Sequence, residues 1–338
     1  MPRISVIIPT YNNQETIEEC LRSVRQSVFH DYELIVADSG SRDATPSIAA
    51  SYADQVITLP GTPHRGRTRN CGLKAAQGEI VVNIDSDVLI KPDTLDKIVR
   101  YFSRHPQIDA LTGLLDKEHP NLDFFSQYKN LYMHYVFKKL PERINFLYGS
   151  IYAIRRQVAE IYDSEIKIAD DTALGQKLAT CGKRIALVND LEVVHLKKYN
   201  LFSFIKNDFK IPYDWAKIFL KYKGWKQLGR NKTGYAHASR QQLLSIIIAP
   251  AILMGVFLGD HSLPFIIVFS LIWSALNFHF SLFLIKEKGS IFGIFSIPVT
   301  FIDNIVMAFG IFCGLFIFSS YQNTKGSRRK GRIDEKAA

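Results

Sequence analysis

Cysteine is scarce in this chain, and its four copies do not stand at the spacing of a zinc site or a disulfide framework. Cys20, Cys71, Cys181 and Cys313 are scattered, so we expect reduced thiols without a structural role. A G-x-G-x-x-G fingerprint is also missing after the first strand-like run, where Pro9-Thr10-Tyr11-Asn12 stands instead. Its absence argues against a dinucleotide-binding enzyme.

Basic residues outnumber acidic ones, and the net charge is +10. The excess is not spread evenly along the sequence. Ten Lys or Arg and two Asp lie in residues 197–232, while six Lys or Arg and two acidic residues lie in 325–336. These basic segments adjoin the most apolar part of the chain. The distribution favours a membrane containing anionic lipid as a partner and argues against nucleic acid.

Long apolar runs are confined to the last third of the chain, at residues 243–259, 263–285 and 291–319. The second and third are long enough to cross a bilayer, and the first just reaches that length. No N-terminal signal peptide is visible, because the chain begins directly with a strand-like run. The sequence predicts a multi-pass protein of the cell membrane (inner or plasma membrane) whose N-terminal part is cytoplasmic.

The third apolar run leaves the topology open. Three crossings would place the basic tail outside the cell, against the positive-inside tendency. The run contains Pro298, Asp303 and Asn304, which are costly in lipid, so this segment either re-enters the membrane or turns Asp303 toward neighbouring helices.

The first hundred residues alternate between strand-like and helix-like patterns. Apolar, β-branched runs predict strands at 4–9, 32–37, 55–59 and 80–84, with helices at 15–27, 44–52 and 70–76 between them. This alternation is typical of an α/β fold with a parallel sheet covered by helices on both faces. Polar residues follow three of the strands: Thr10, Asp38, and the pair Asp85 and Asp87. They are expected to share one sheet edge and to bind a ligand there. Asp85 and Asp87 suit a divalent cation, although an Asp-rich turn would show the same pattern.

Three segments carry a family resemblance: VIIPTYNN, LIVADSGSRDAT and RTRNCGLKAAQGEIVVNIDSD. In this order and spacing they resemble the family 2 glycosyltransferases, which have a GT-A (Rossmann-like) nucleotide-sugar fold. The similarity covers about the first 110 residues and resumes at 149–155 and 170–185. It implies a GT-A domain with a mostly parallel sheet over residues 1–196. Basic and aromatic interfacial helices would follow at 197–240, transmembrane helices at 241–320, and a basic tail at 321–338.

The resemblance also implies which residues bind the donor, a nucleotide sugar. Pro9, Thr10, Tyr11, Asp38, Arg69, Asp85 and Ser86 would contact it, with Ser39 standing where the family often has a second acid. Arg69 would lie near the pyrophosphate, and Arg65 and Arg67 are expected on the same loop. Asp87 would be the direct ligand of a Mg²⁺ or Mn²⁺ ion, with Asp85 near the ribose or a metal-bound water. His195 would either complete the metal shell or have a structural role.

The same resemblance implies the catalytic and acceptor residues. Asp170 and Asp171 stand where the family usually has Glu-Asp, so Asp171 would be the catalytic base. Considered outside this motif series, the two would be read as an N-cap pair of a helix. Gly149 and Ser150 would lie against the sugar or the acceptor.

The leading hypothesis is a metal-dependent, inverting glycosyltransferase (EC 2.4) at the cytoplasmic membrane face. It would move a sugar from a UDP- or GDP-sugar to a lipid or lipid-linked acceptor, such as a polyprenyl phosphate, in glycolipid or cell-envelope polysaccharide biosynthesis. One alternative is a processive polysaccharide synthase, although the Gln-x-x-Arg-Trp motif of such enzymes is absent. Another is a non-catalytic, nucleotide-binding membrane scaffold. Homo-oligomers through the transmembrane helices are a further expectation.

Overall fold

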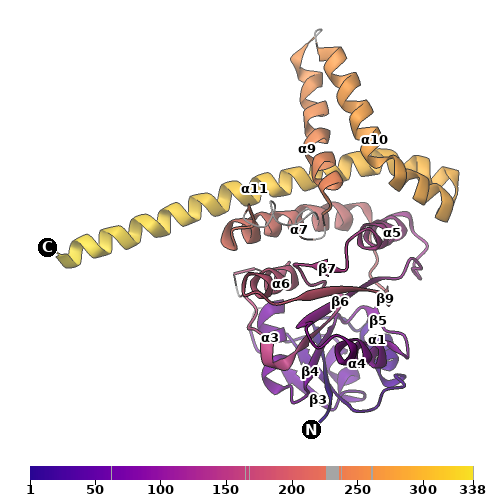
Figure 1. Cartoon of the computed structure of the whole chain (residues 1–338), viewed down its shortest axis with the longest axis vertical. Helices are drawn as coiled ribbons and strands as arrows, with labels where there is room; N and C mark the ends of the chain where they lie inside the picture. The colour runs from indigo at the N-terminus through magenta and orange to yellow at the C-terminus, as the bar shows by residue number, and fades with distance from the viewer. Residues whose placement is uncertain are drawn as a thin grey trace. The chain divides into compact units, whose positions relative to one another are not determined.

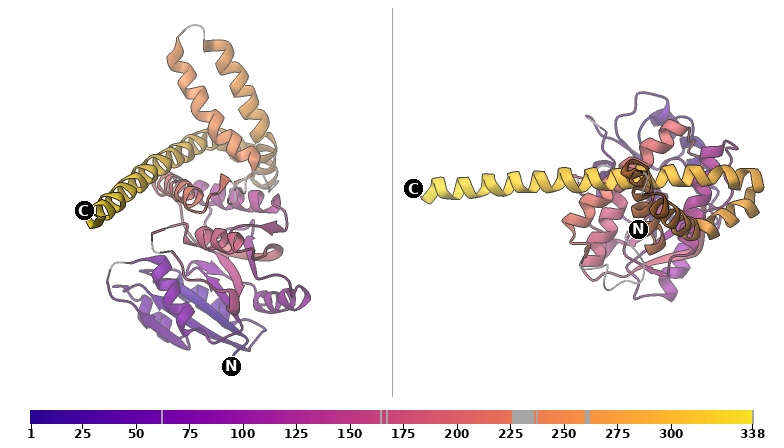
Figure 2. Two further views of the ribbon diagram at one scale, coloured as in Figure 1. Left: turned by 60° about the vertical axis from the view of Figure 1, so that its left-hand side comes forward. Right: turned by 90° about the horizontal axis from the view of Figure 1, so that it is seen from above.

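The computed structural model forms two compact units, one comprising Met1–Phe202 with residues 235–239 and the other comprising residues 203–234 and 240–338. It describes the chain except Thr62, Ser164, Lys167, residues 226–235, His237, Asp260, His261 and Ala338, and it leaves the side chains of Leu258 and residues 319–337 undescribed. Figures 1 and 2 show both units as ribbons.

The first unit is built on a mixed, mostly parallel sheet in the order β3-β2-β1-β4-β8-β6-β9-β5, with β7 also paired to β9. Its strands are β1 (Ile4–Thr10), β2 (Tyr32–Asp38), β3 (Gln55–Thr58), β4 (Ile80–Ile84), β5 (Val88–Leu89), β6 (Ala110–Leu115), β7 (Arg143–Ile144), β8 (Ile151–Arg155) and β9 (Ile185–His195). Strands β1 to β4 pair in parallel, and β8 is inserted antiparallel between β4 and β6. The mixed sheet confirms the predicted fold class, an α/β domain with a mostly parallel sheet.

The helices of the first unit connect these strands along the chain (Figure 1). They are α1 (Ile17–Arg25), α2 (Thr45–Ala50), α3 (Arg65–Ala75), α4 (Thr94–Arg104), α5 (Phe124–Lys138), the short 3₁₀ helix η1 (Arg156–Val158) and α6 (Asp170–Thr180). Strands β1 and β4 are buried along their whole length, which explains why their sequences are continuously apolar rather than alternating.

One sequence-based prediction of local structure is wrong. The segment carrying Arg65, Arg67 and Arg69 is not a loop, because α3 begins at Arg65 and contains all three residues. The side chain of His64 caps the helix by accepting a hydrogen bond from the backbone N–H of Arg67 (3.4 Å). Arg65 and Arg69 are four residues apart and therefore share a helix face.

The second unit is helical and consists of α7 (Leu201–Lys221, which begins in the first unit), α9 (Arg240–Gly255), the 3₁₀ helix η2 (Val256–Leu258), α10 (Leu263–Lys288) and α11 (Ser290–Ala337). Ala249, Ile252 and Trp273 form its buried core, with Phe301 and Ile305 of α11 packed against them. Among the described residues two helical segments, Leu263–Lys288 and Ser290–Phe318, are long and apolar enough to cross a membrane. The first predicted span folds as α9, which at 16 residues falls short of that length.

Candidate active site

The predicted donor residues gather at the carboxyl-terminal edge of the sheet. Strands β1 and β2 pair in parallel so that Thr10 lies opposite Asp38, and both residues end their strands. Strand β4 ends at Ile84, so Asp85 leaves the sheet at the same edge. In open α/β sheets this edge is where ligands bind.

Asp38 shapes the loop that follows β2. Its carboxylate is fully buried and accepts hydrogen bonds from the backbone N–H groups of Gly40 (3.1 Å) and Ser41 (2.9 Å) and from the Ser41 hydroxyl (2.5 Å). Gly40 has φ +79°, a conformation that glycine adopts without strain. The neighbouring Tyr11 is 41% exposed. Asp38 therefore holds the loop in place, while the ring of Tyr11 is open to a planar ligand; Pro9 beneath it is buried in β1.

Arg69 connects two acidic segments inside the site. Its guanidinium is 1% exposed, donates from Nη2 to Asp85 (2.7 Å) and donates from Nη1 to Asp170 (2.6 Å). Burial by itself would lower the pKa of Arg69, but Asp170 and Asp85 outweigh burial and hold that pKa well above its ordinary value. The fork geometry of arginine suits two carboxylates at once. Arg69 thus ties the end of β4 to the first turn of α6.

Asp171 differs from its neighbour Asp170 in its contacts. Asp170 is fully buried against Arg69. Asp171 accepts hydrogen bonds from the backbone N–H of Gly149 and from that of Thr172 (2.7 Å). Burial raises the pKa of the Asp171 carboxyl to about 6, and the charge of Asp170 adds to the rise while Arg69 opposes it. A carboxylate with a pKa near 6 is a competent general base near neutral pH.

Gly149 lies where these charged groups converge. A Cβ atom at this position would be 2.9 Å from Oδ2 of Asp171, 3.2 Å from Oδ2 of Asp85 and 3.3 Å from Nη2 of Arg69. The sequence predicted Gly149 as a contact for sugar or acceptor, and the structure places it among the carboxylates. Ser150 follows it, buried, and its carbonyl accepts a 3.4 Å hydrogen bond from the N–H of Asp85.

Asp87 and His195 come together through a strand pair that the sequence did not reveal. Val88 of β5 lies opposite His195 of β9 in an antiparallel ladder, and the N–H of Leu196 donates to the carbonyl of Asp87 (2.8 Å). This pairing brings Oδ1 of Asp87 to 3.5 Å from Nε2 of His195. Burial would raise the pKa of Asp87, but His195, Lys197 and Arg65 outweigh burial and hold it well below its usual range. Ser86, between the two aspartates, is buried, and its carbonyl accepts from the Thr16 hydroxyl (3.1 Å).

The Asp87–His195 pair fits a divalent cation held jointly with a ligand. Within the described part of the chain no three His, Cys, Asp or Glu side chains converge on one point. The two side chains are partly open to solvent, at 19% and 13%. Magnesium and similar ions are commonly held by one or two protein groups, with phosphates and waters filling the remaining positions. Imidazole nitrogen is a frequent ligand of divalent transition metals.

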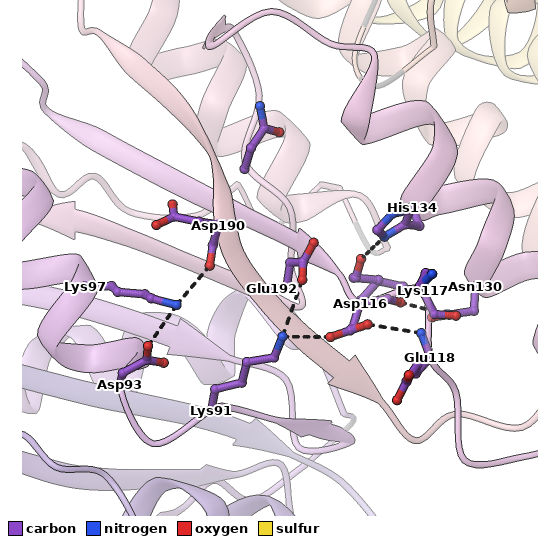
Figure 3. A network of polar contacts seen from close by, with 12 residues as sticks. Lys91, Asp93, Lys97, Asp116, Lys117, Glu118, Asn130, His134, Asp190 and Glu192 are labelled. Atoms are coloured by element: carbon purple, nitrogen blue, oxygen red, sulfur yellow. Dashed lines mark hydrogen bonds and ion pairs between the residues drawn. The ribbon is translucent and has the colours of Figure 1, made fainter.

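A polar network holds the segment after β5 against β6 and β9 (Figure 3). Lys91 follows β5, and its Nζ contacts Oδ2 of Asp116 (2.8 Å) and Oε2 of Glu192 (3.4 Å). Glu192 lies in β9, three residues before His195. The network therefore fastens both strands that carry the Asp87–His195 pair.

Sequence reasoning missed one cation that faces this site, Lys197, and one aromatic residue that lines it, Tyr162; Arg65, which it considered beside Arg69, also faces the site. Arg65 is exposed, and its pKa is raised chiefly by Asp85, with contributions from Asp170 and Asp87. Lys197 contributes to the low pKa of Asp87. Tyr162 lies under the Arg69 guanidinium, 5.8 Å from ring centre to Cζ, and its hydroxyl bonds that of Tyr152. Lys197, two residues after His195, could have been found from spacing; nothing in the irregular segment around Tyr162 marks it.

Comparisons with known proteins find a glycosyltransferase family model, related sequences and a structure of the same fold. Residues 5–171 match the family model Glycosyl transferase family 2. The chain is 35% identical over 103 residues to the "Putative glycosyltransferase EpsH" of Bacillus subtilis, which covers 29% of this chain and 30% of EpsH. It is 27% identical over 212 residues to the "O-antigen chain rhamnosyltransferase RfbN" of Salmonella typhimurium, covering 58% of this chain and 67% of RfbN. The alignment with EpsH thus covers less than a third of that relative's length.

A solved structure shares the fold over most of the chain. The mannosyltransferase PcManGT of Pyrobaculum calidifontis, described in complex with GDP-Man and Mn²⁺, superposes with a TM-score of 0.59 at 20% identity. The superposition covers 91% of this chain and 87% of PcManGT. At this identity the likeness establishes a common fold, and no more.

Proposed function

The chain carries a domain of glycosyl transferase family 2, and we propose that it is an inverting, metal-dependent glycosyltransferase acting at the cytoplasmic face of the cell membrane. Its donor is a nucleotide sugar, UDP- or GDP-linked, and its acceptor is a lipid or lipid-linked hydroxyl or phosphate. Of the chain's features, the environment of Asp171 supports this proposal most directly.

Asp171 supports an inverting mechanism because one base suffices for a single displacement. The acceptor oxygen attacks the anomeric carbon, the bond from that carbon to the nucleoside diphosphate breaks, and the acceptor proton passes to Oδ2 or Oδ1 of Asp171. With a pKa of about 6, most Asp171 side chains are ionised at neutral pH and can take this proton. After release of the product the proton returns to water.

Asp170, Arg69 and Gly149 support the base without touching the acceptor. Asp170 forms an ion pair with Arg69, so it orients the first turn of α6 rather than acting as a second base. The Gly149 N–H holds one oxygen of Asp171. On the donor side, Tyr11, Thr10 and the loop held by Asp38 are the proposed nucleotide contacts.

The leaving diphosphate brings negative charge that needs compensation. Asp87 and His195 are the proposed ligands of Mg²⁺ or Mn²⁺, with Asp85 beside them, and such an ion would neutralise the departing phosphates. PcManGT is described with Mn²⁺ and GDP-Man, which is consistent with the same use here. Arg65 adds a positive side chain within the electrostatic reach of Asp85 and Asp87.

A lipid acceptor is supported by the second unit. Two of its described helices are long and apolar enough to cross a membrane, and a protein anchored in this way meets acceptors dissolved in the same bilayer. The proposal places the enzyme among cell-membrane proteins with several membrane-inserted helices.

Donor turnover by the purified full-length protein in detergent tests the proposal. Each UDP- and GDP-sugar is offered with Mg²⁺ or Mn²⁺ and a native lipid extract, beside Asp87→Ala, Asp171→Ala and the surface control Asp93→Ala. Lipid-dependent release of one nucleotide that both site variants lose and the control keeps supports the proposal. Long product ladders on gels would instead favour a processive synthase. Binding of nucleotide without turnover of any donor would favour a non-catalytic scaffold.

A further inference from the structure

Helix α7 packs directly on α11 at two glycines four residues apart. A Cβ atom on Gly310 would lie 2.4 Å from the carbonyl oxygen of Phe209, and one on Gly314 would lie 2.4 Å from that of Tyr213. The rings of Phe209 and Phe309 also meet, 5.7 Å between centres. Only glycine allows two helix backbones to approach so closely. The contact falls inside the apolar segment Ser290–Phe318.

The position of this contact decides where α11 can lie. Within eight residues of Phe209, α7 carries five charged side chains: Lys206, Asp208, Lys210, Asp214 and Lys217. Lys206 and Lys210 are exposed. If Ser290–Phe318 crossed the hydrocarbon, it would draw this part of α7 into lipid with it. A charge costs roughly 2.5 to 3.5 kcal/mol at the centre of a bilayer and less near its surface, so the exposed Lys206 and Lys210 favour a position of α7 at or outside the surface.

The faces of α11 suit a helix lying along a membrane surface. At about 100° per residue, the exposed apolar side chains fall within roughly 200° of arc. They are Ile291, Ile294, Phe295, Ile297, Ile302, Phe309, Phe312, Leu315, Phe316 and Ile317. The opposite side carries the glycines and the buried polar residues Ser296, Thr300, Asp303 and Asn304. The wide apolar side is therefore open to lipid, and the narrower side with the glycines packs against protein.

Helix α7 adds a stripe of positive charge. Lys206, Lys210, Lys217 and Lys221 fall within about 60° of arc on this helix. Figures 1 and 2 show α7 on one side of α11 and the α9–α10 hairpin rising on the other. Within this unit, the charged helix and the apolar hairpin thus lie on opposite sides of α11.

We propose that α7 and α11 form a platform lying along an anionic lipid surface, with only the α9–α10 hairpin inserted, so that the basic tail stays on the side of the catalytic unit. The inference rests on the membrane association proposed above. The apolar face of α11 is immersed in the headgroup boundary. Helix α7, on the side of α11 away from the hairpin, stays out of the hydrocarbon, where its lysine stripe is attracted electrostatically by anionic headgroups. Helix α9 continued by η2 (Arg240–Leu258) makes the first crossing and α10 the second, so the chain makes no third crossing. The tail at 325–336 then obeys the positive-inside tendency.

Cysteine labelling of the full-length protein in sealed membrane vesicles tests the platform. The native Cys181 is exposed and reports the side of the catalytic unit, while Ser327→Cys reports the tail. Each reporter is studied alone, with Cys71 and Cys313 replaced by Ser and the buried Cys20 retained. A membrane-impermeant maleimide is applied to right-side-out and inverted vesicles. Gly331→Cys is a second tail reporter in case the first variant is not produced.

We expect Cys181 and both tail reporters to be labelled in vesicles of the same orientation. Labelling of the tail in the opposite orientation would show that Ser290–Phe318 crosses the membrane and would overturn the platform, leaving the glycosyltransferase proposal intact. Flotation of the vesicles on a density gradient accompanies the labelling. Protein that does not float with the vesicles would overturn both the platform and the proposed membrane anchorage.

Discussion

The carboxylate of Asp171 is held by the backbone N–H of Gly149, a residue 22 positions earlier in the chain. The contact joins the start of α6 to the segment before β8, which pairs with β4. Because β4 ends at the acidic pair Asp85 and Asp87, one short backbone segment positions the proposed base against the proposed donor site. The site is therefore organised by main-chain geometry as much as by side chains.

The pH dependence of turnover should report Asp171. Its pKa is raised to about 6 in the folded protein, so the base is protonated and inactive below that pH and ionised above it. We expect kcat to fall about tenfold for each pH unit below 6 and to level off above it. Asp171→Asn should lower kcat by roughly 10² to 10⁴-fold. A pH profile that stays level down to pH 4.5 would contradict this role.

A methyl group at Gly149 should disable the site while leaving the fold intact. In Gly149→Ala the new Cβ would sit 2.9 Å from Oδ2 of Asp171, so the carboxylate must move. Displacements of this kind cost up to about 10²-fold in rate. Gly182→Ala is the matched control, since its Cβ would meet nothing within 4 Å. The control should lose some thermal stability, because Gly182 has φ +78°, and keep its activity. Equal activity of Gly149→Ala and Gly182→Ala would contradict the prediction.

Replacing Arg69 alone should destabilise the first unit more than replacing Arg69 and its buried partner Asp170 together. Arg69→Met leaves Asp170 as a buried, unpaired charge, which costs about 3 to 5 kcal/mol. The double variant Arg69→Met with Asp170→Asn should recover part of that loss, because no lone charge remains. Thermal unfolding in detergent of the native chain, Arg69→Met, Asp170→Asn and the double variant completes the double-mutant cycle. Strictly additive losses would show that the pair is not coupled.

Loss of one imidazole should weaken the response to metal. In His195→Gln the partner of Asp87 at 3.5 Å is gone. We expect the Mn²⁺ concentration for half-maximal turnover to rise about tenfold or more, one lost ligand being worth at least about 1.4 kcal/mol. His105→Gln is the control, since it alters a histidine elsewhere in the unit whose ring contacts that of Tyr101 at a tilt of 33°. An unchanged metal response would make His195 a structural residue.

The network around Lys91 should make stability sensitive to acid. Burial would raise the pKa values of Asp116 and Glu192, but hydrogen bonds and charges from Lys91 and Lys138 outweigh burial and lower both. A lowered folded-state pKa stabilises the fold above the unfolded value near 4, and this stabilisation is lost as pH falls through the folded value. Thermal unfolding between pH 7 and pH 3 should therefore show a smaller acid-induced loss for Lys91→Met than for the native chain. Parallel curves for the two proteins would contradict it.

Much of the first unit could be predicted from sequence because its central strands are continuously apolar. Strands β1, β2 and β4 and the polar residues after them follow from the pattern alone, and the order of motifs identified the family. Strand β5 could not be predicted, since two residues carry no periodicity and their pairing with β9 joins segments about a hundred residues apart. The start of α3 was also missed, because its arginines and glycine resemble a loop until the His64 cap is seen.

The candidate site was predicted as residue types but not as contacts. Asp170 and Asp171 are adjacent and chemically identical in the sequence. Only the fold separates them, by directing one toward Arg69 and the other toward Gly149. The same holds for the apolar runs, where composition alone could not distinguish a crossing helix from one that carries α7 on its polar face.

Strand β5 is only two residues long, yet its pairing with β9 connects the segment of Asp85 and Asp87 to β9. A cation held by Asp87 and His195 would connect the start of β5 to the end of β9 and so stabilise this short ladder. Ligand binding and local folding are then thermodynamically linked, and each tenfold excess of ion over its dissociation constant adds about 1.4 kcal/mol to the closed form. The ion proposed for the transfer step would thus also stabilise the pairing of β5 with β9.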